Sequence, residues 1–210
     1  MIHRKLSPRI AILLTAIHGA WSLTICSQAP GAELHSKAPE RDKEERAIAI
    51  PSTLDRDNTM EVVKALVARA QELASSGNYK GAIAIWSKLL DWATKELGPA
   101  SPGTARILDK LAELHARKGD HKAAEQLYIQ ALRVLEQSAG PTDRVTAIAL
   151  NNLAEHYRQQ GAYSKAEPLY IRALAIEERA LGPTNPGTAA TLNNLAALYL
   201  SLIHISEPTR

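Results

Sequence analysis

Apolar residues recur with helical spacing along most of the chain, and the stretch before Gly161 shows the pattern most clearly. Leu150, Leu153, Ala154 and Tyr157 occupy positions i, i+3, i+4 and i+7. That spacing places the four side chains on one face of an α-helix. Gly161 predicts the end of the helix because glycine adopts a left-handed backbone at no steric cost.

A second helix is expected over residues 163–180. Ala166, Tyr170 and Ala173 fall on one face of this segment. Gly182 is followed by a proline, which cannot continue the backbone hydrogen bonds of a helix, so the helix is expected to stop there. The two segments together predict a helical hairpin.

The hairpin recurs along the chain with a period of 42 residues. Two glycine series and five series of apolar residues keep this interval. Their members are Gly77, Gly119 and Gly161; Gly98, Gly140 and Gly182; Leu66, Leu108, Leu150 and Leu192; Ala70, Ala112, Ala154 and Ala196; Ala82, Ala124 and Ala166; Trp86, Tyr128 and Tyr170; and Leu90, Leu132 and Leu174. A lone hairpin cannot bury its apolar face, so neighbouring hairpins stack. The sequence therefore predicts an all-α fold, an α-solenoid of antiparallel helix pairs.

The order of small and large residues in the third unit resembles the tetratricopeptide repeat, in particular the 42-residue subclass found in kinesin light chains and many bacterial proteins. The residues that carry the resemblance are Leu153, Ala154, Tyr157, Gly161, Tyr163, Ala166, Tyr170 and Ala173. It covers about residues 59–199, as three full repeats and one half repeat. The resemblance implies a right-handed superhelix that binds peptide segments or partner domains of other proteins in its concave groove.

The resemblance also implies which side chains face a bound peptide, because the first helix of each unit lines the groove of such solenoids. Carried onto this chain, the positions are Asp109, Glu113, Arg117, Asn151, Glu155, Arg158 and Asn193. Asparagine suits this role because its amide offers both a donor and an acceptor to an extended peptide backbone. Asp109 and Lys110 stand where the third unit has a pair of asparagines.

The first two units depart from the pattern. In the first unit Arg69 replaces the leucine of later units, as a polar cap at the end of a solenoid would, and Gly81 is expected to interrupt the second helix early. In the second unit His115 and His121 stand where the third unit has tyrosines. We expect both histidines to occupy aromatic packing positions, because a zinc motif such as H-E-x-x-H is absent. No metal or other cofactor is predicted.

Charge and motifs narrow the classes of function. The net charge is +3 and the pI is about 9.0. Outside residues 1–46 and 200–210, however, the chain has 17 basic and 16 acidic residues. This part lacks the concentration of basic charge that nucleic-acid binding requires. Phosphate-loop, nucleophile-elbow and flavin motifs are missing from the sequence. The chain is predicted to bind no nucleic acid and not to be an enzyme.

Residues 1–29 have the layout of a secretory signal peptide. Basic residues precede residues 10–25, which are uncharged, and small residues follow. This apolar stretch is shorter than the roughly 20 residues that span a bilayer. An N-terminal anchor and lipidation of Cys26, the only cysteine, are the alternatives to cleavage. Residues 30–58 are expected to be a disordered linker, and the protein is expected to be exported: periplasmic, extracellular or membrane-anchored.

Residues 200–210 leave the repeat pattern and resemble the translated sequence of a transposase adapter used in DNA library preparation. We interpret them as a non-native read-through tail. The fourth unit then lacks its second helix, and Leu192, Leu195 and Tyr199 are expected to be partly uncovered. Because an exposed apolar stripe of this kind favours association, self-association through this end is expected.

Two functional hypotheses follow. The first is a scaffold that binds peptide segments or partner domains of other proteins, since the repeats carry no active-site chemistry. The second is a sensing or regulatory arm of a larger enzyme, for example a protease-like one, whose catalytic domain is missing from this chain.

Overall fold

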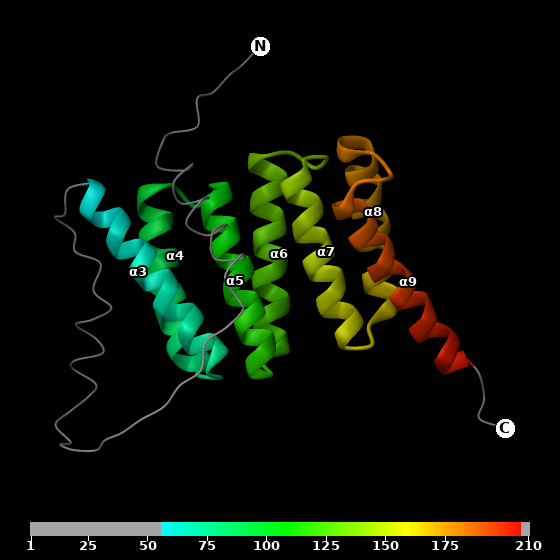
Figure 1. Cartoon of the computed structure of the whole chain (residues 1–210), viewed down its shortest axis with the longest axis horizontal. Coiled ribbons are helices and arrows are strands. Elements are labelled where there is room, and N and C mark those ends of the chain that lie inside the picture. Colours follow the sequence, from blue (N-terminus) through cyan, green and yellow to red (C-terminus); the bar gives the residue numbers. More distant parts are fainter. Residues whose placement is uncertain (1–55, 207–210) are drawn as a thin grey trace, which may run out of the picture. The chain divides into compact units, whose positions relative to one another are not determined.

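The computed structural model describes residues 56–206 (Figure 1). This part of the chain consists of seven α-helices and their connecting turns and contains no strand. The helices are α3 (Arg56–Ser75), α4 (Tyr79–Glu96), α5 (Pro102–Lys118), α6 (His121–Ser138), α7 (Arg144–Gln159), α8 (Tyr163–Leu181) and α9 (Pro186–Ser206). α3 and α4 belong to one compact unit, and α5 to α9 belong to another. The predicted all-α class is confirmed.

Several predicted segments lie outside the described residues. They are the signal peptide or anchor at 1–29 with Cys26, most of the linker at 30–58, and the end of the tail at 207–210. α3 begins at Arg56, three residues before the expected start of the repeats. None of the helices described is long and apolar enough to cross a membrane.

The prediction that Gly81 interrupts the second helix of the first unit is wrong. Gly81 lies in the first turn of α4, and its backbone N–H donates to the side-chain oxygen of Asn78, the N-cap residue, at 3.0 Å. A Cβ at this position would lie 3.1 Å from Cδ1 of Leu73 on α3. Glycine is therefore present because the two helices approach closely, and the N-cap compensates for its low helix propensity.

In the compact unit formed by α5 to α9, α5 pairs with α6 and α7 pairs with α8, and a short turn joins the helices of each pair. Gly119 adopts a φ of 90° between α5 and α6. The next residue, Asp120, caps α6 by accepting a hydrogen bond from the backbone N–H of Ala123 at 3.3 Å. Gly161 takes the equivalent left-handed conformation between α7 and α8, as the sequence predicts.

Each of the helices α5, α7 and α9 begins with the same side-chain hydrogen bond. A buried threonine hydroxyl in the first turn donates to the carbonyl oxygen of the glycine six residues earlier. The donors are Thr104, Thr146 and Thr188, and the acceptors are Gly98, Gly140 and Gly182, at 2.8, 2.8 and 2.9 Å. These bonds fix how the chain enters each helix. The threonines follow the 42-residue period, so the sequence carries a signal for this bond as well.

One apolar seam runs through all five helices from α5 to α9. One cluster of buried residues comprises Ala112, Ala124, Tyr128, Leu153, Ala154, Tyr157, Ala166, Tyr170 and Leu198. The four alanines are completely buried, since small side chains let the paired helices approach closely. The recurring spacing of small and large residues in the sequence is therefore the packing pattern of this core.

α9 extends beyond the predicted end of the fourth unit at Tyr199 and continues to Ser206. The glycine that ends α7 has Ile203 as its counterpart one period later, so nothing stops the helix there. Leu202 packs against the core cluster. The first seven residues of the predicted tail thus prolong the helix.

A buried carboxylate interrupts the apolar seam on α8. Glu177 is 6% exposed and occupies the position that Leu135 fills one period earlier. Its Oε2 has no hydrogen-bond partner within the described part of the chain. A buried polar atom without a partner is destabilising.

We therefore expect Glu177→Leu to raise the free energy of unfolding by about 1–2 kcal/mol. Urea unfolding followed by circular dichroism measures the change. Glu178→Leu is the matched control, because Glu178 is exposed and its replacement should change stability little. A Glu177→Leu protein less stable than the wild type would show that the carboxylate is compensated in solution.

Candidate peptide-binding face

Side-chain hydrogen bonds join the first helices of successive pairs. Asn152 on α7 donates through Nδ2 to both carboxylate oxygens of Asp109 on α5, each at 3.0 Å. One period later, Asn194 on α9 donates to Oδ1 of Asn151 on α7 at 3.1 Å. We call these four residues the polar ladder. It fixes α5, α7 and α9 side by side, so their polar side chains form one face.

Two of the seven predicted peptide-binding residues, Asp109 and Asn151, belong to this ladder. Their oxygens accept hydrogen bonds from a neighbouring helix rather than remaining free for a ligand. Thr191 adds a second, longer bond to Oδ1 of Asn151 at 3.5 Å. These two side chains therefore position the helices, whatever else they contact.

The electrostatic environment of Asp109 is unusual for an aspartate. Burial raises the pKa of Asp109 to about 6, and the nearby Glu113 acts in the same direction. The hydrogen bond from Asn152 and the charges of Lys110 and Arg106 oppose the increase. The ladder thus contains one carboxylate that resists ionisation, at a position where later repeats have an asparagine.

Glu113 and Glu155 occupy equivalent positions on α5 and α7, and both are engaged by basic side chains. Glu113 accepts from Lys110 and from Arg117, each at 2.6 Å. Glu155 accepts two hydrogen bonds from Arg158, at 2.7 and 2.8 Å. The basic side chains predicted to face a peptide are therefore oriented by the glutamates predicted beside them.

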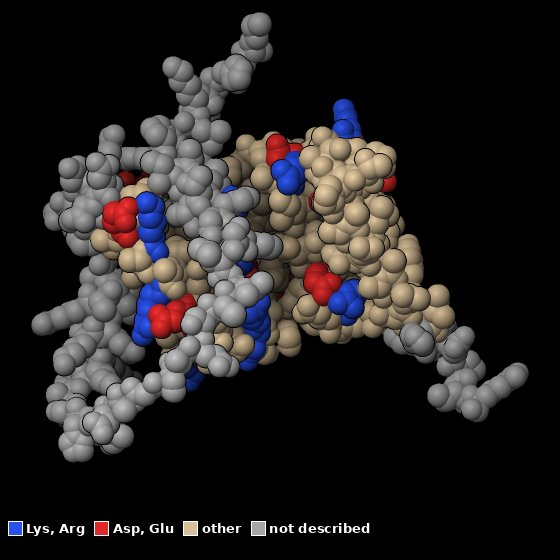
Figure 2. All heavy atoms as spheres, in the orientation of Figure 1, with Lys and Arg blue, Asp and Glu red and all other residues tan. Residues whose placement is uncertain are grey.

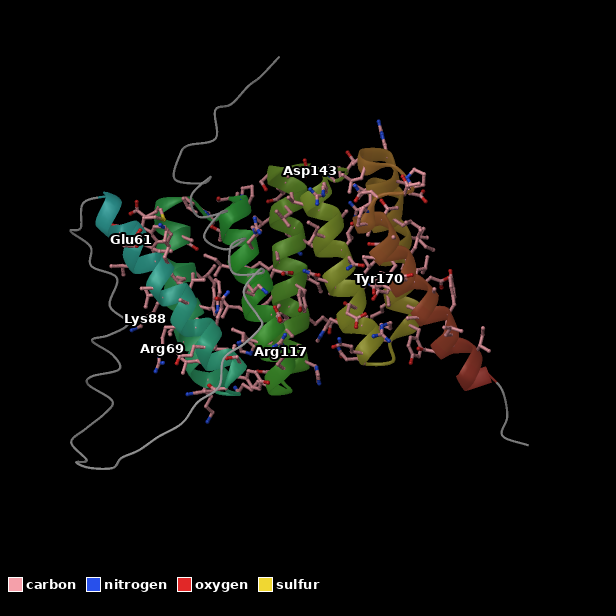
Figure 3. The ribbon with its side chains drawn as sticks, in the orientation of Figure 1. Glu61, Arg69, Lys88, Arg117, Asp143 and Tyr170 are labelled. Atoms are coloured by element: carbon pink, nitrogen blue, oxygen red, sulfur yellow. The ribbon has the colours of Figure 1, made fainter. Side chains whose placement is uncertain are left out.

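Further hydrogen bonds converge on Glu155 from Gln159 at 2.8 Å and from the hydroxyl of Tyr170 on α8 at 2.7 Å. Tyr170 is labelled in Figure 3. Burial alone would raise the pKa of Glu155, but these bonds and those from Arg158 outweigh it, and the pKa is lowered. Glu155 is therefore a fixed anion that links the two helices of its pair.

All seven predicted residues lie on α5, α7 and α9, and they differ in exposure. Asp109, Glu113, Asn151, Glu155 and Arg158 are half-buried. Arg117 and Asn193 are exposed. A ligand on this face would meet Arg117 and Asn193 first, because they are the exposed members of the set, although Arg117 is also paired with Glu113.

A second set of bonds, which the sequence did not predict, joins successive pairs through tyrosines. The hydroxyl of Tyr157 on α7 donates to Glu125 on α6 at 2.7 Å, and Tyr199 on α9 donates to Glu167 on α8 at the same distance. Lys165 lies over the Tyr157 ring, 4.9 Å from its centroid, and donates to Glu125 at 3.2 Å. The recurrence of these glutamates in the sequence therefore has a structural cause.

His156 is a buried histidine that was not predicted to lie in the core. It is 3% exposed, and leucine occupies its position one period before and after, at Leu114 and Leu198. The centroid of its ring is 5.7 Å from that of His121 and 5.3 Å from that of Tyr128. Its Nε2 is 3.2 Å from the carbonyl oxygen of His121. Burial and the neighbouring His121 lower the pKa of His156, against the effects of this bond and of Glu125.

His115 and His121 were both predicted to fill aromatic packing positions, and the structure differs from this prediction. His121 is exposed and touches the core through the ring of His156. His115 is half-buried, with Nδ1 3.3 Å from a carboxylate oxygen of Asp120. Across residues 56–206, no group of three or more side chains is arranged to hold a metal ion.

The helix pairs stack through a repeated apolar seam, and side-chain hydrogen bonds join their first helices, α5, α7 and α9. This arrangement is an α-solenoid of helical hairpins. Residues 61–137 and 145–203 match the family model of the tetratricopeptide repeat. Because the match covers more than half of the chain, the protein belongs to the tetratricopeptide-repeat family.

Solved structures show the same fold at low sequence identity. BtubC (BKLC) from P. vanneervenii aligns with a TM-score of 0.61 and 23% identity, over 77% of this chain and 63% of that one. Two crystal structures of a putative kinesin light chain with nearly identical TPR-like repeats from Podosopora anserina each align with a TM-score of 0.59 and 19% identity, over 65% of both chains. The chain thus spans less than two thirds of each of these proteins. A search of curated proteins gives no significant sequence match.

Proposed function

We propose that this protein is an interaction scaffold that binds an extended peptide segment of a partner protein across α5, α7 and α9. Tetratricopeptide repeats generally mediate protein–protein interaction, which supports the class of function. The observation that carries the proposal is the polar ladder together with the ion pairs of Glu113 and Glu155. They fix the polar side chains of this face before any partner arrives, and such preorganisation lowers the entropic cost of binding.

The exposed side chains indicate the chemistry of the peptide. Arg117 is paired with Glu113, and the remaining N–H groups of its guanidinium can pair with a carboxylate of the partner. Asn193 offers an amide that pairs with peptide backbone. A peptide that crosses from α5 to α9 would therefore carry an acidic side chain near Arg117 and extended backbone at Asn193.

The test is a selection of random, displayed peptides on the full chain, followed by affinity measurement for the peptides recovered. We expect Arg117→Glu and Asn193→Ala each to weaken binding about tenfold, as loss of one charged or polar contact does. Arg133→Glu is the matched control, because Arg133 is exposed and lies on α6, the second helix of its pair, outside the proposed face. Equal affinities for the wild type and all three variants would show that the selected peptides bind elsewhere.

A further inference from the structure

A buried histidine lies at the junction between the α5–α6 and α7–α8 pairs. At this junction α6 and α7 run side by side (Figure 1). His156, in the last turn of α7, is 3% exposed, and its Nε2 lies 3.2 Å from the carbonyl oxygen of His121, the first residue of α6. A carbonyl oxygen only accepts hydrogen bonds, so Nε2 carries the proton of the neutral ring. Nδ1 is therefore the nitrogen that takes up a proton on acidification.

The neighbouring repeats have leucine at this position. Leu114 and Leu198 are both buried, with exposed fractions of 5% and 0%. A neutral imidazole can pack in such a position, but a charged one loses its hydration there without an equivalent replacement. The third repeat therefore has, in an otherwise apolar position, a side chain whose fit depends on pH.

The groups around the ring of His156 favour its neutral form. They are His121, Glu125 and Tyr128 on α6, Tyr157 on α7 and Lys165 on α8; beside them, Asp120 pairs with His115 of α5. Glu125 favours the charged ring, but its Oε1 already accepts from Tyr157 at 2.7 Å and from Lys165 at 3.2 Å. Burial, which has the largest effect, and the neighbouring His121 ring lower the pKa of His156 against the bond to the His121 carbonyl and the charge of Glu125.

We propose that His156 makes the junction between these two helix pairs acid-sensitive, so that protonation of its ring separates the end of α7 from the start of α6. The charged ring regains its hydration when water reaches it, and the two helices must part for this to happen. The bond from Tyr157 to Glu125 crosses the same junction and is lost with the contact. Asn152 lies about one turn further from the end of α7. Its bond to Asp109 remains, which confines the opening to the turn end of the pairs.

Acidification acts on His156 and on Asp109 with opposite signs. The neutral His156 ring contributes stability that is complete above the ordinary histidine pKa of about 6.5 and is lost as the pH falls toward its lowered pKa. The pKa of Asp109 is raised to about 6, so its protonation strengthens the fold. On the face drawn in Figure 2, acidic and basic side chains lie next to one another, so short-range neighbours dominate the electrostatics there. Loosening of the junction on mild acidification therefore cannot come from Asp109.

The opening would also change the proposed peptide-binding face. Glu155 and Arg158 flank His156 on α7, and they are bonded to each other on that face. Separation of the end of α7 from α6 would shift both side chains relative to Arg117 on α5. This consequence rests on the proposed function, whereas the acid-sensitive junction does not. A bound peptide is therefore expected to be released as the pH falls.

Hydrogen exchange measured by mass spectrometry on the full chain tests the junction without a ligand. Exchange should be compared at about pH 7.5, 6.5 and 5.5, which span the ordinary histidine pKa, after correction for the intrinsic pH dependence of exchange. In residues 121–128 and 152–159, the equilibrium constant for opening should rise below about pH 6.5, approaching tenfold for each unit of pH because one proton is taken up. Residues 130–138, in the second half of α6, are the internal control and should change little.

Two substitutions identify the group responsible. His156→Gln keeps an N–H donor for the His121 carbonyl and does not titrate, and His156→Leu introduces the side chain of the neighbouring repeats. Both should abolish the acid-dependent rise in exchange. His115→Gln is the matched control, because His115 is bonded to Asp120 within its own pair, and it should keep the rise.

Absence of the rise in the wild-type protein would overturn the proposal, whether or not the variants fold. An equal rise in the wild type and in either variant of His156 would also overturn it, because another group would then control the opening. The link to binding is measured separately, with a peptide selected on the full chain at pH 7.5. Its affinity should fall several-fold at about pH 5.5 for the wild type and not for His156→Gln. Failure to select any peptide would contradict the proposed function and not the junction, whereas equal affinity at both pH values would refute the link.

Discussion

Replacement of Tyr170 by alanine is expected to lower the free energy of unfolding by about 3–5 kcal/mol, the range seen when a buried aromatic side chain is truncated to alanine. Tyr170 is fully buried in the core cluster that runs through α5 to α9. Its hydroxyl donates to Glu155 at 2.7 Å. The substitution therefore leaves a cavity in the apolar seam and removes one of the bonds that join α7 to α8.

Urea unfolding followed by circular dichroism measures this loss. The adjacent Ile171 is 48% exposed, so Ile171→Ala is the matched control and should change stability by about 0.5 kcal/mol or less. Tyr170→Phe keeps the ring and should cost about 1.5–3 kcal/mol, the contribution of a hydrogen bond to a charged group. If Tyr170→Ala were no more harmful than Ile171→Ala, the ring could not lie in the core in solution.

The hairpins were predictable because their signals are local or periodic. Gly161 ends a helix through its own backbone conformation, and Ala166 repeats with a fixed interval because every pair of helices crosses in the same way. A single sequence with internal repeats supplies several copies of the same packing solution. The apolar pattern, the turns and the pairing of helices could therefore be inferred without coordinates.

The polar side chains were less predictable because an amide or carboxylate bonds equally well to a ligand and to a neighbouring helix. The sequence shows that Asn151 recurs as Asn193, but it does not show that Asn151 accepts from Asn194. Gly81 illustrates a similar ambiguity, since glycine can end a helix or permit a close approach. Only the positions of the neighbouring helices distinguish these roles.

His156 and Glu177 were missed for a related reason. Each substitutes for a leucine of the preceding repeat, at Leu114 and Leu135 respectively, so each interrupts a periodic apolar series. A comparison of equivalent positions for buried titratable residues would have found both. The third repeat therefore has ionisable side chains at two positions where the second repeat is apolar.

The second large effect concerns Asp109, and it combines stability with pH. Asp109→Asn is expected to raise the free energy of unfolding at pH 7 by about 2–3 kcal/mol, because the substitution removes a carboxylate whose ionisation burial opposes. Asn151 accepts from Asn194 one period later, as Asp109 accepts from Asn152. An asparagine at position 109 can therefore keep the ladder bond.

The expected pH dependence follows from the pKa of Asp109. In the folded protein this pKa is about 6, against an ordinary value of 3.8. The folded state therefore binds its proton more tightly than the unfolded state does, and stability falls as the pH rises from about 4 to about 6. Above this range the whole penalty is present, and the difference between the two pKa values corresponds to about 3 kcal/mol.

Unfolding of the wild type and of Asp109→Asn should be measured at several values between about pH 4 and pH 7.5, which bracket the titration of this carboxylate. The two proteins should be about equally stable near the acidic end and diverge as the pH rises, with the variant the more stable. Burial lowers the pKa of His156, so its contribution has the opposite sign, because stability is lost as the pH falls below the ordinary histidine value of about 6.5. That contribution is common to both proteins and cancels in their difference.

Asp91→Asn serves as the control, because Asp91 is an exposed aspartate on α4. Its effect on stability should be small at every pH. A gap between Asp109→Asn and the wild type that stays constant over the whole pH range would show that the carboxylate is solvated in the folded state. The expected, pH-dependent gap would instead show that burial of Asp109 in the folded state opposes its ionisation.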